Sequence, residues 1–361
     1  MIRVLHAVGK MHRAGQETIT MNLYRALDRS CVQFDFLVHT DEKCDYDDEI
    51  AELGGRLFHV QKINCGVIRY VRSIRKIVRD NGYTIVHLHT AHAAGFFVLL
   101  AAKLGGARVR IAHSRNNNAE LPWLHKLLRP FIRRYSTDRF ACSEAAGRWM
   151  FGDHCDFTVK RNAIDTNAFR FSEGTRESLR AALGLEGRLT IGHVGRFVEQ
   201  KNHAFLLQIC AAIAKRQPDF RALLIGAGEL EPKMKALADE LGIAENLLFL
   251  GPRGDVPQLM QAMDVFVFPS LYEGFGNVMI EAQAAGLPCV AADTLTRETN
   301  VSGNVAYLPL TESAGRWADV ILAAKPGKRE QGASIVADAG YDVYREATGF
   351  MEFYEAAAKR G

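Results

Sequence analysis

Short apolar runs of strand length alternate with longer segments whose apolar residues recur at helical spacing along the first half of the chain. The predicted strands of this half cover residues 3–8, 33–38, 56–59, 85–89, 108–113 and 139–142. Helical spacing is found between them, at residues 19–27, 68–79 and 94–104. This alternation is typical of a parallel sheet covered by helices on both faces.

The same alternation starts again after residue 170, with predicted strands at 190–194, 222–225, 247–250, 265–269 and 288–291. Turn-forming residues at 162–165 separate the two series. A chain of 361 residues also exceeds the length that one hydrophobic core usually serves. We therefore predict an α/β fold of two Rossmann-like, doubly wound domains, 1–165 and 166–342, that face each other across a cleft.

The end of the chain has helical spacing and no strand after it, so we expect a helix at 343–361 to complete the first domain. Parallel sheets bind ligands beyond the carboxyl ends of their strands. The loops that follow the predicted strands are therefore the places to look for chemistry.

Composition narrows the class of protein. With 48% hydrophobic and 24% charged residues, the chain is in the globular range. No apolar stretch approaches the ~20 residues of a membrane span, and Arg3 and His6 interrupt the first apolar run, which we interpret as a strand rather than a signal peptide. The seven cysteines include no Cys-x-x-Cys pair and are expected to be free thiols. We expect a cytoplasmic protein.

The charge is uneven along the chain. Residues 1–170 carry 26 basic and 17 acidic side chains, whereas residues 171–361 carry 19 and 24. Basic residues recur at helical spacing beside apolar ones in two segments, 69–79 and 126–134. Two interpretations stay open: a face that contacts an anionic inner leaflet, or an ordinary solvated helix face. Nucleic acid is not an expected partner, because no basic, aromatic-interleaved strand or helix-turn-helix pattern occurs.

Residues 195–202 join a predicted strand to a predicted helix and contain two cations, Arg196 and Lys201. Two cations and the first amides of a helix form a cradle that suits a diphosphate. The alternative is that both are solvated surface cations.

Residues 273–281 follow another predicted strand and contain Glu273, two glycines and Glu281. The glycines let the backbone approach a ligand, and the two carboxylates suit the hydroxyls of a sugar and a ribose. As an isolated pair, the carboxylates would equally complement the dipole of a helix N-terminus.

Two further patterns are weaker. Gly226 and Gly228 form a turn that could admit a phosphate or sugar, but position 231 is Glu, so the dinucleotide-binding fingerprint is incomplete. His87, His89 and His92 are interpreted as lining a strand end without binding a metal.

The two segments at 195–202 and 273–281 together resemble the donor-site signature of the retaining nucleotide-sugar glycosyltransferases of family 4, which have the GT-B fold. The resemblance covers the whole chain and extends to residues 14–17, 86–90, 111–116, 162–165, 224–229 and 249–251. The sequence departs from the family pattern at Ala14, where glycine is usual.

The resemblance implies a glycosyltransferase that moves a hexose or related sugar from a nucleotide diphosphate, expected to be UDP, to a glycan or polyprenyl-diphosphate-linked acceptor in cell-surface polysaccharide assembly. It implies no cofactor and no metal. The implied catalytic residues are His113, Arg196, Lys201 and Glu273. The implied donor-binding residues are Gly15, Gly195, Arg196, Lys201, Gly226, Gly228, Arg253, Glu273, Gly274, Phe275, Gly276, Asn277, Val278 and Glu281. The implied acceptor-side residues are His89, Ser114, Arg115 and Asn116.

Two other functions fit the same architecture: a nucleotide-sugar 2-epimerase, and a non-catalytic protein that binds nucleotide sugars. Fold analogy alone does not choose between them.

Overall fold

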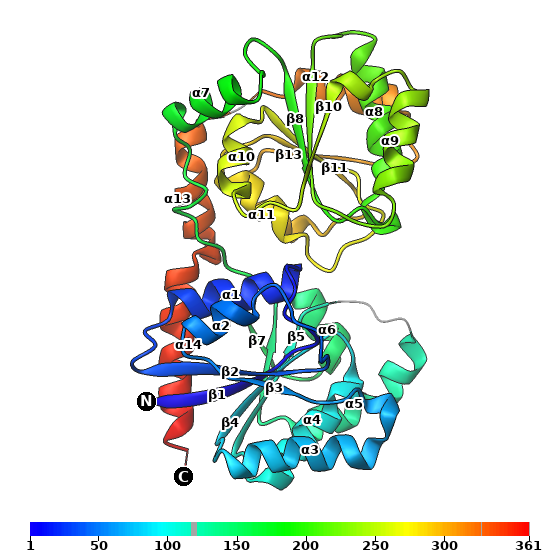
Figure 1. The fold of residues 1–361 in the computed structure, drawn as a ribbon. Helices are drawn as coiled ribbons and strands as arrows, with labels where there is room; N and C mark the ends of the chain where they lie inside the picture. The colour runs from blue at the N-terminus through cyan, green and yellow to red at the C-terminus, as the bar shows by residue number, and fades with distance from the viewer. Residues whose placement is uncertain (117–120, 326, 361) are drawn as a thin grey trace. The chain divides into compact units, whose positions relative to one another are not determined.

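The structure is a computed structural model that describes residues 1–116, 121–325 and 327–360. The chain divides into two compact units, one made of Met1–Ala163 with Val343–Gly361 and the other of Ile164–Asp342 (Figure 1). The division lies two residues before the boundary expected from the turn-forming residues. Helix α14 (Val343–Ala358) lies in the first unit.

The first unit contains a seven-stranded, all-parallel sheet in the order β3-β2-β1-β4-β5-β6-β7. Its strands are β1 (Ile2–Ala7), β2 (Val32–Val38), β3 (Leu57–His59), β4 (Ile85–Thr90), β5 (Val109–Ser114), β6 (Asp138–Ala141) and β7 (Thr158–Val159). The first six were predicted within one residue at either end. The edge strand β7 was missed, because two residues are too few to give a pattern.

Helices cover both faces of this sheet (Figure 1). One face carries α1 (Gly15–Ala26), α2 (Asp47–Glu52) and α14, and the other carries α3 (Val67–Asp80), α4 (Phe96–Gly105) and α5 (Pro122–Tyr135). Helix α6 (Glu144–Phe151) contacts α5. In α3 the buried residues Tyr70, Ile74 and Val78 recur every four positions, so one stripe of the helix packs on the sheet and the rest is left to solvent.

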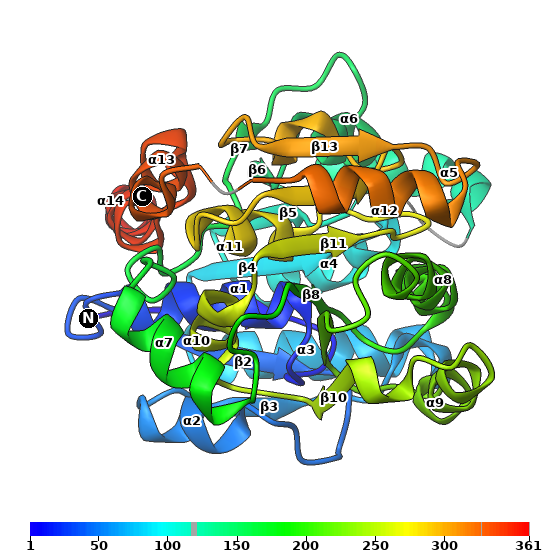
Figure 2. The same ribbon diagram turned by 90° about the horizontal axis from the view of Figure 1, so that it is seen from above.

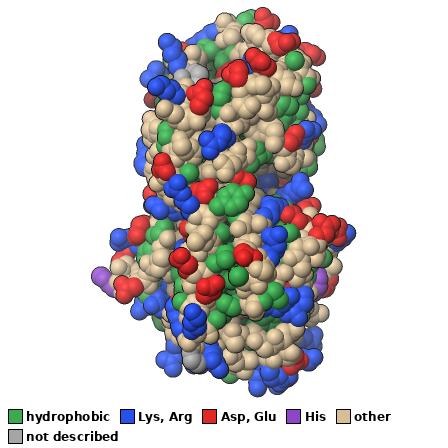
Figure 3. Space-filling view, turned by 90° about the vertical axis from the view of Figure 1, so that its left-hand side faces the viewer, with side chains coloured by type: hydrophobic (Ala, Val, Ile, Leu, Met, Phe, Trp, Pro, Cys, Tyr) green, Lys and Arg blue, Asp and Glu red, His purple; other side chains and the backbone are tan. Residues whose placement is uncertain are grey.

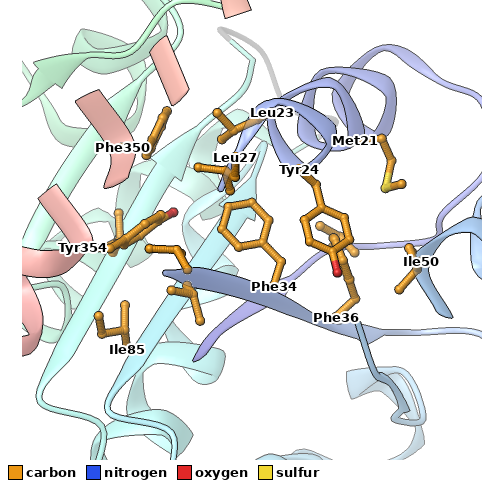
Figure 4. Close-up of a cluster of buried hydrophobic side chains, with 14 of the residues drawn as sticks. Met21, Leu23, Tyr24, Leu27, Phe34, Phe36, Ile50, Ile85, Phe350 and Tyr354 are labelled. Atoms are coloured by element: carbon orange, nitrogen blue, oxygen red, sulfur yellow. The ribbon is translucent and has the colours of Figure 1, made fainter. Parts of the chain in front are cut away.

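The last helix is part of the first unit's core. Figure 4 shows Phe350 and Tyr354 of α14 beside Phe34 of β2 and Tyr24 of α1, and all four side chains are buried. The Phe34 and Tyr354 rings are 6.0 Å apart and edge-on, an arrangement that aromatic pairs favour. The chain's C-terminal helix therefore helps to hold the histidine-bearing strands β1, β4 and β5 described below.

The second unit contains a six-stranded parallel sheet in the order β10-β9-β8-β11-β12-β13. Its strands are β8 (Thr190–Val194), β9 (Arg221–Ile225), β10 (Leu247–Gly251), β11 (Val265–Phe268), β12 (Cys289–Ala292) and β13 (Val305–Leu308). The first five correspond to the predicted strands. Strand β13 was missed, since this edge strand has only four residues and is only partly buried.

Two groups of helices flank this sheet (Figures 1 and 2). Helices α8 (His203–Ala214), α9 (Glu231–Glu240) and α12 (Ala314–Ala323) form one group; α7 (Glu173–Ala182), α10 (Val256–Ala262), α11 (Asn277–Ala284) and α13 (Gly332–Val336) form the other. Each strand and the helix that follows it are joined by a loop at the carboxyl end of the strand. Strands β8 and β11 are neighbours in the sheet although 70 residues separate their sequences, which places the two predicted motifs beside one another.

Candidate active site

The loops that follow β8 and β11 are joined by hydrogen bonds. The backbone N–H of Leu271 donates to the Gln200 carbonyl at 2.9 Å, and the Gln200 side-chain amide donates to the Tyr272 carbonyl at 2.9 Å. The Asn202 side-chain amide donates to the Pro269 carbonyl at 3.1 Å. The two segments that carry the family signature thus form one structure at the carboxyl edge of the sheet, where open parallel sheets bind their ligands.

Lys201 and Glu273 form an ion pair across the two loops. The Lys201 Nζ lies 2.6 Å from Glu273 Oε1, and the side chains are only 16% and 9% exposed. Lys201 Nζ also lies over the Phe268 ring, 4.8 Å from its centroid. The low exposure strengthens the attraction between the two charges and fixes the lysine in one position. A ligand anion would therefore find this cation already oriented.

Arg196 is the second cation of the segment, and it differs from Lys201 in its surroundings. Its side chain is exposed, and it has no hydrogen-bond or ion-pair partner among the described residues. Because Lys201 is balanced by Glu273, Arg196 supplies the uncompensated positive charge at this edge. An arginine fork of this kind binds phosphate oxygens in a bidentate manner.

Glu281 lies on α11, one turn after the helix begins at Asn277. Gly276 precedes the helix with φ of 84°, in the left-handed region that favours glycine. The Glu281 carboxylate has no hydrogen-bond or ion-pair partner among the described residues, and burial raises its pKa to about 7. A partly exposed, unpartnered carboxylate on the first turns of a helix is suited to accept hydrogen bonds from hydroxyl groups of a ligand.

Gly226 and Gly228 have a structural reason to be glycine. A Cβ on Gly226 would lie 2.1 Å from the Gly195 carbonyl oxygen, and a Cβ on Gly228 would lie 2.5 Å from the Phe197 carbonyl oxygen. The β9–α9 loop therefore packs directly against the backbone of the β8–α8 loop. This packing alone accounts for both residues, and donor binding by them stays a prediction.

Arg253 lies apart from the two cations in the sheet order. It follows β10, which β9 separates from β8, and it pairs with Asp255 at 2.6 Å on the surface. Phe275, another predicted donor-site residue, is buried and stacks on Tyr341, with 5.9 Å between the ring centroids.

In the first unit, the predicted residues gather at the ends of β4 and β5. Arg115 donates from Nε to His89 Nδ1 at 3.2 Å and from a terminal nitrogen to Asn162 Oδ1 at 2.7 Å. The buried Ser114 hydroxyl donates to the Ala146 carbonyl at 2.9 Å, and its acceptor-side role stays a prediction. Asn116 follows directly, and Gly15 is the first residue of α1 after the neighbouring strand β1.

His113 belongs to a cluster of four buried histidines that also contains His6, His87 and His89. These residues project from β1, β4 and β5 onto the sheet face that α14 covers, since they alternate with residues of the opposite core. His92, which the sequence groups with His87 and His89, is exposed and lies outside the cluster. His6 was missed as a partner, because only the placement of β1 beside β4 reveals it.

One nitrogen from each of His6, His87 and His89 lies within 4.8 Å of the others, so these residues are a candidate metal cluster. Apart from Nε2 of His6 and Nε2 of His113, the ring nitrogens of the four histidines are hydrogen-bonded to one another, to Tyr354 or to Arg115. The His87 and His89 rings are stacked, with 11° between their planes, which does not aim their lone pairs at one point. This arrangement fits a hydrogen-bonded network better than tetrahedral coordination, and the expected absence of a metal stays a prediction.

The outer surfaces of α3 and α5 combine cations with exposed apolar side chains. Trp123 and Leu127 of α5 are 65% and 63% exposed. The cations Arg69, Arg72, Arg75, Lys126, Arg133 and Arg134 have no hydrogen-bond or ion-pair partner among the described residues. On the side of the molecule shown in Figure 3, by contrast, basic and acidic side chains are interspersed. Within the described part of the chain, no helix has the length and apolar character needed to cross a bilayer.

Comparison with known proteins agrees with these features. Residues 13–168 match the family model described as Glycosyltransferase Family 4, and residues 188–324 match the one described as Glycosyl transferases group 1. A Bacillus subtilis glycosyltransferase named EpsF is 39% identical, over 99% of this chain and 97% of that protein. An Escherichia coli enzyme named UDP-Gal:alpha-D-GlcNAc-diphosphoundecaprenol alpha-1,3-galactosyltransferase is 26% identical, over 84% of this chain and 80% of that enzyme.

Among solved structures, the Anabaena protein HepE in complex with UDP and glucose has a TM-score of 0.81 at 19% identity, over 99% of this chain and 100% of that one. At that identity the likeness shows the fold. With the paired Rossmann-like units, the joined signature loops and a relative similar over its full length, the chain belongs to glycosyltransferase family 4 and is a glycosyltransferase of the GT-B class.

Proposed function

We propose that this glycosyltransferase transfers a sugar, with retention of configuration, from a UDP-sugar to a glycan or polyprenyl-diphosphate-linked acceptor in cell-surface polysaccharide assembly. The part of this proposal that concerns the donor rests on the edge of the sheet formed by the loops after β8 and β11. There, an uncompensated Arg196, an oriented Lys201 and an unpartnered Glu281 occur within one unit. The complexes of HepE with UDP and with UDP-glucose support UDP as the nucleotide.

In this proposal each residue acts on a different part of the donor. Arg196 and Lys201 bind the diphosphate and offset the negative charge that it gains as the bond to the sugar breaks. Glu281 accepts hydrogen bonds from the ribose hydroxyls, while Glu273 and the amides at the start of α11 hold the sugar. His113 of the first unit donates a hydrogen bond to a sugar hydroxyl.

The acceptor is assigned to the first unit, at the ends of β4 and β5. Arg115 offers a charged donor there, and the exposed cations of α3 and α5 suit a phosphorylated lipid carrier. The Escherichia coli relative, whose name specifies a diphosphoundecaprenol-linked acceptor, supports this class of substrate.

Donor turnover is expected to persist in excess EDTA. The side chains of Arg196 and Lys201 supply the positive charge that a divalent ion provides in other sugar transferases, so no ion is needed at the diphosphate. The measurement is release of UDP from a UDP-sugar panel, with and without an acceptor extract, in EDTA and after readdition of Mg²⁺ or Mn²⁺. Activity that disappears with EDTA and returns with either ion would refute the assignment of the donor site. Acceptor-independent inversion at the sugar C2 would instead favour the epimerase.

We also propose that the α3 and α5 surface rests on an anionic leaflet. Two features support this: cations without partners, and large apolar side chains such as Trp123 and Leu127 that are exposed beside them. Cations bind acidic headgroups, while the apolar residues enter the boundary of the acyl chains.

Binding to phosphatidylglycerol-containing vesicles is expected to rise with anionic lipid content and to fall with salt, at about 1 kcal/mol for each engaged Lys or Arg. Charge reversal at Arg72, Arg75, Arg133 and Arg134 is expected to abolish co-sedimentation and to leave UDP affinity unchanged. Reversal at the exposed Arg216, which pairs with Asp319 in the second unit, provides the control. Vesicle binding that responds neither to salt nor to the first set of substitutions would mean that these helix faces are simply solvated.

A further inference from the structure

Two hydrogen-bonded chains cross the buried histidine cluster of the first unit. In one, the Tyr354 hydroxyl lies 2.6 Å from His87 Nδ1, and His87 Nε2 lies 3.0 Å from His113 Nδ1. In the other, Arg115 Nε lies 3.2 Å from His89 Nδ1, and His89 Nε2 lies 2.9 Å from His6 Nδ1. Each chain ends at a buried nitrogen with no partner in the described part of the protein: His113 Nε2 in the first and His6 Nε2 in the second.

All four imidazoles are neutral, so each carries one N–H and one lone pair. Burial is the main cause that lowers the pKa of each of them, and the Arg115 charge lowers it further. In a chain of neutral imidazoles, a proton fixed at one end sets the tautomer of every ring along it. The group at the start of each hydrogen-bonded chain therefore decides whether the last nitrogen donates or accepts a hydrogen bond.

The Arg115 chain has only one possible direction. A guanidinium donates and never accepts, so His89 Nδ1 is the acceptor and His89 Nε2 carries the proton. That proton is donated to His6 Nδ1, which leaves an N–H at His6 Nε2.

The direction of hydrogen bonding along the Tyr354 chain follows from the number of partners that the Tyr354 hydroxyl has. His87 Nδ1 is the only hydrogen-bond partner of the Tyr354 hydroxyl among the described residues, and Tyr354 is fully buried. If the hydroxyl accepted from His87, its own proton would have no acceptor, at the full cost of desolvating a donor. Burial also raises the pKa of Tyr354 well above its usual value, so the hydroxyl keeps its proton. Tyr354 therefore donates, His87 carries its proton on Nε2, and His113 accepts at Nδ1.

We propose that Tyr354 of the C-terminal helix is a positioning residue that, through His87, holds His113 in the Nε2–H tautomer, so that a sugar hydroxyl bound at the end of β5 meets a hydrogen-bond donor. The assignment to a sugar rests on the proposed function, whereas the tautomer rests on the contacts alone. An unpartnered buried N–H in a native structure calls for an explanation, and a hydroxyl or ring oxygen of a bound sugar supplies one. In this state His113 cannot accept a proton at Nε2, which excludes it as a general base at that atom.

The tautomer can be measured without any turnover, by long-range ¹H–¹⁵N correlation on protein labelled at its 12 histidines, with His113 assigned from a His113→Gln sample. The expected result is a protonated, pyrrole-type Nε2 and an unprotonated, pyridine-type Nδ1 at His113. In Tyr354→Phe the directing hydrogen bond is lost, and the ratio of Nε2–H to Nδ1–H forms is expected to fall by about tenfold. An unprotonated Nε2 in the wild-type protein overturns the proposal even if the variant does not fold.

Tyr24→Phe is the matched control. Tyr24 is buried in the same core, and its hydroxyl donates to Gln33 Oε1 at 3.0 Å, away from the histidines. This variant is expected to keep the wild-type His113 tautomer. If Tyr354→Phe also keeps it, Tyr354 does not direct the chain and the proposal is wrong.

The affinities for a UDP-sugar and for UDP distinguish a positioning role of Tyr354 from a merely structural one. In Tyr354→Phe the Kd of a UDP-sugar is expected to rise about 3- to 10-fold, while the Kd of UDP, which lacks the sugar, stays unchanged. Equal losses for both ligands would show general damage and would contradict the proposal. A wild-type protein that has the expected tautomer but binds no UDP-sugar would refute the proposed function and leave the Tyr354 chain in place.

Discussion

Replacing Lys201 by alanine is expected to lower kcat/KM for the UDP-sugar by about 10²-fold or more, with most of the loss in kcat. In the proposed function, Lys201 meets a diphosphate whose negative charge grows as the sugar leaves, so its contribution would be greatest in the transition state. The ion pair with Glu273 and the contact with Phe268 fix the ammonium before the donor binds. Arg196→Ala is expected to have an effect of the same order.

A second lysine with a similar environment provides the control. Lys235 of α9 lies 2.7 Å from Glu231 and over the Phe249 ring at 5.3 Å, but its side chain is 53% exposed. An exposed ion pair contributes about 0–1 kcal/mol. Lys235→Ala is therefore expected to keep kcat/KM within about twofold of the wild type.

Loss of Lys201 also leaves Glu273 as an unpaired, largely buried carboxylate, so thermal unfolding of the variant must be measured beside its kinetics. The double variant Lys201→Ala with Glu273→Gln removes that unpaired charge. If the double variant regains wild-type kcat/KM, Lys201 serves only to neutralise Glu273, and the diphosphate role is refuted.

The sequence predicts this fold well where a segment's own pattern is sufficient. Strand β8 was predicted with the residues it has, Thr190–Val194, because an apolar run lies between Arg188 and Gly195. The edge strands β7 and β13 were missed, since a short strand buried on few sides has no pattern of its own.

The site is harder to predict, because its contacts depend on strand order. The Lys201–Glu273 pair exists because β11, not β9 alone, lies beside β8, and no local pattern contains that neighbour relation. The family resemblance named both residues but not their contact. It also gave no reason to connect His113 to Tyr354, which lies on a helix at the other end of the chain. For Gly226, the structure adds a packing reason for glycine, the Gly195 backbone, and the interpretation as a ligand-facing glycine stays a prediction.

Glu281→Gln is expected to weaken binding of UDP while making the free protein more stable at alkaline pH. Hydrogen bonds to a charged group contribute about 1.5–3 kcal/mol, so losing those from the ribose hydroxyls would raise the Kd by about 10- to 150-fold. The loss is expected to be smaller for 2′-deoxy-UDP, which offers one hydroxyl fewer. Titration calorimetry with both nucleotides measures the difference, and equal losses for the two would refute the contact with the ribose.

The gain in stability follows from the pKa of Glu281, which burial raises from 4.5 to about 7 in the folded protein. A raised pKa means that the folded state prefers the protonated carboxyl. The favourable contribution is therefore fully present below about pH 4.5 and is lost as the pH rises through 7. The full shift corresponds to about 3 kcal/mol, and partial exposure of the side chain reduces this to about 1–2 kcal/mol. Glutamine carries no charge, so the free energy of unfolding of Glu281→Gln relative to wild type is expected to rise between pH 4.5 and 7 and then to level off.

Urea unfolding between pH 4.5 and 7 measures this difference, with Glu240→Gln on the exposed end of α9 as the control. A difference that does not change with pH would mean that Glu281 is well solvated in the free protein. In that case the Glu281 carboxylate would not destabilise the free protein.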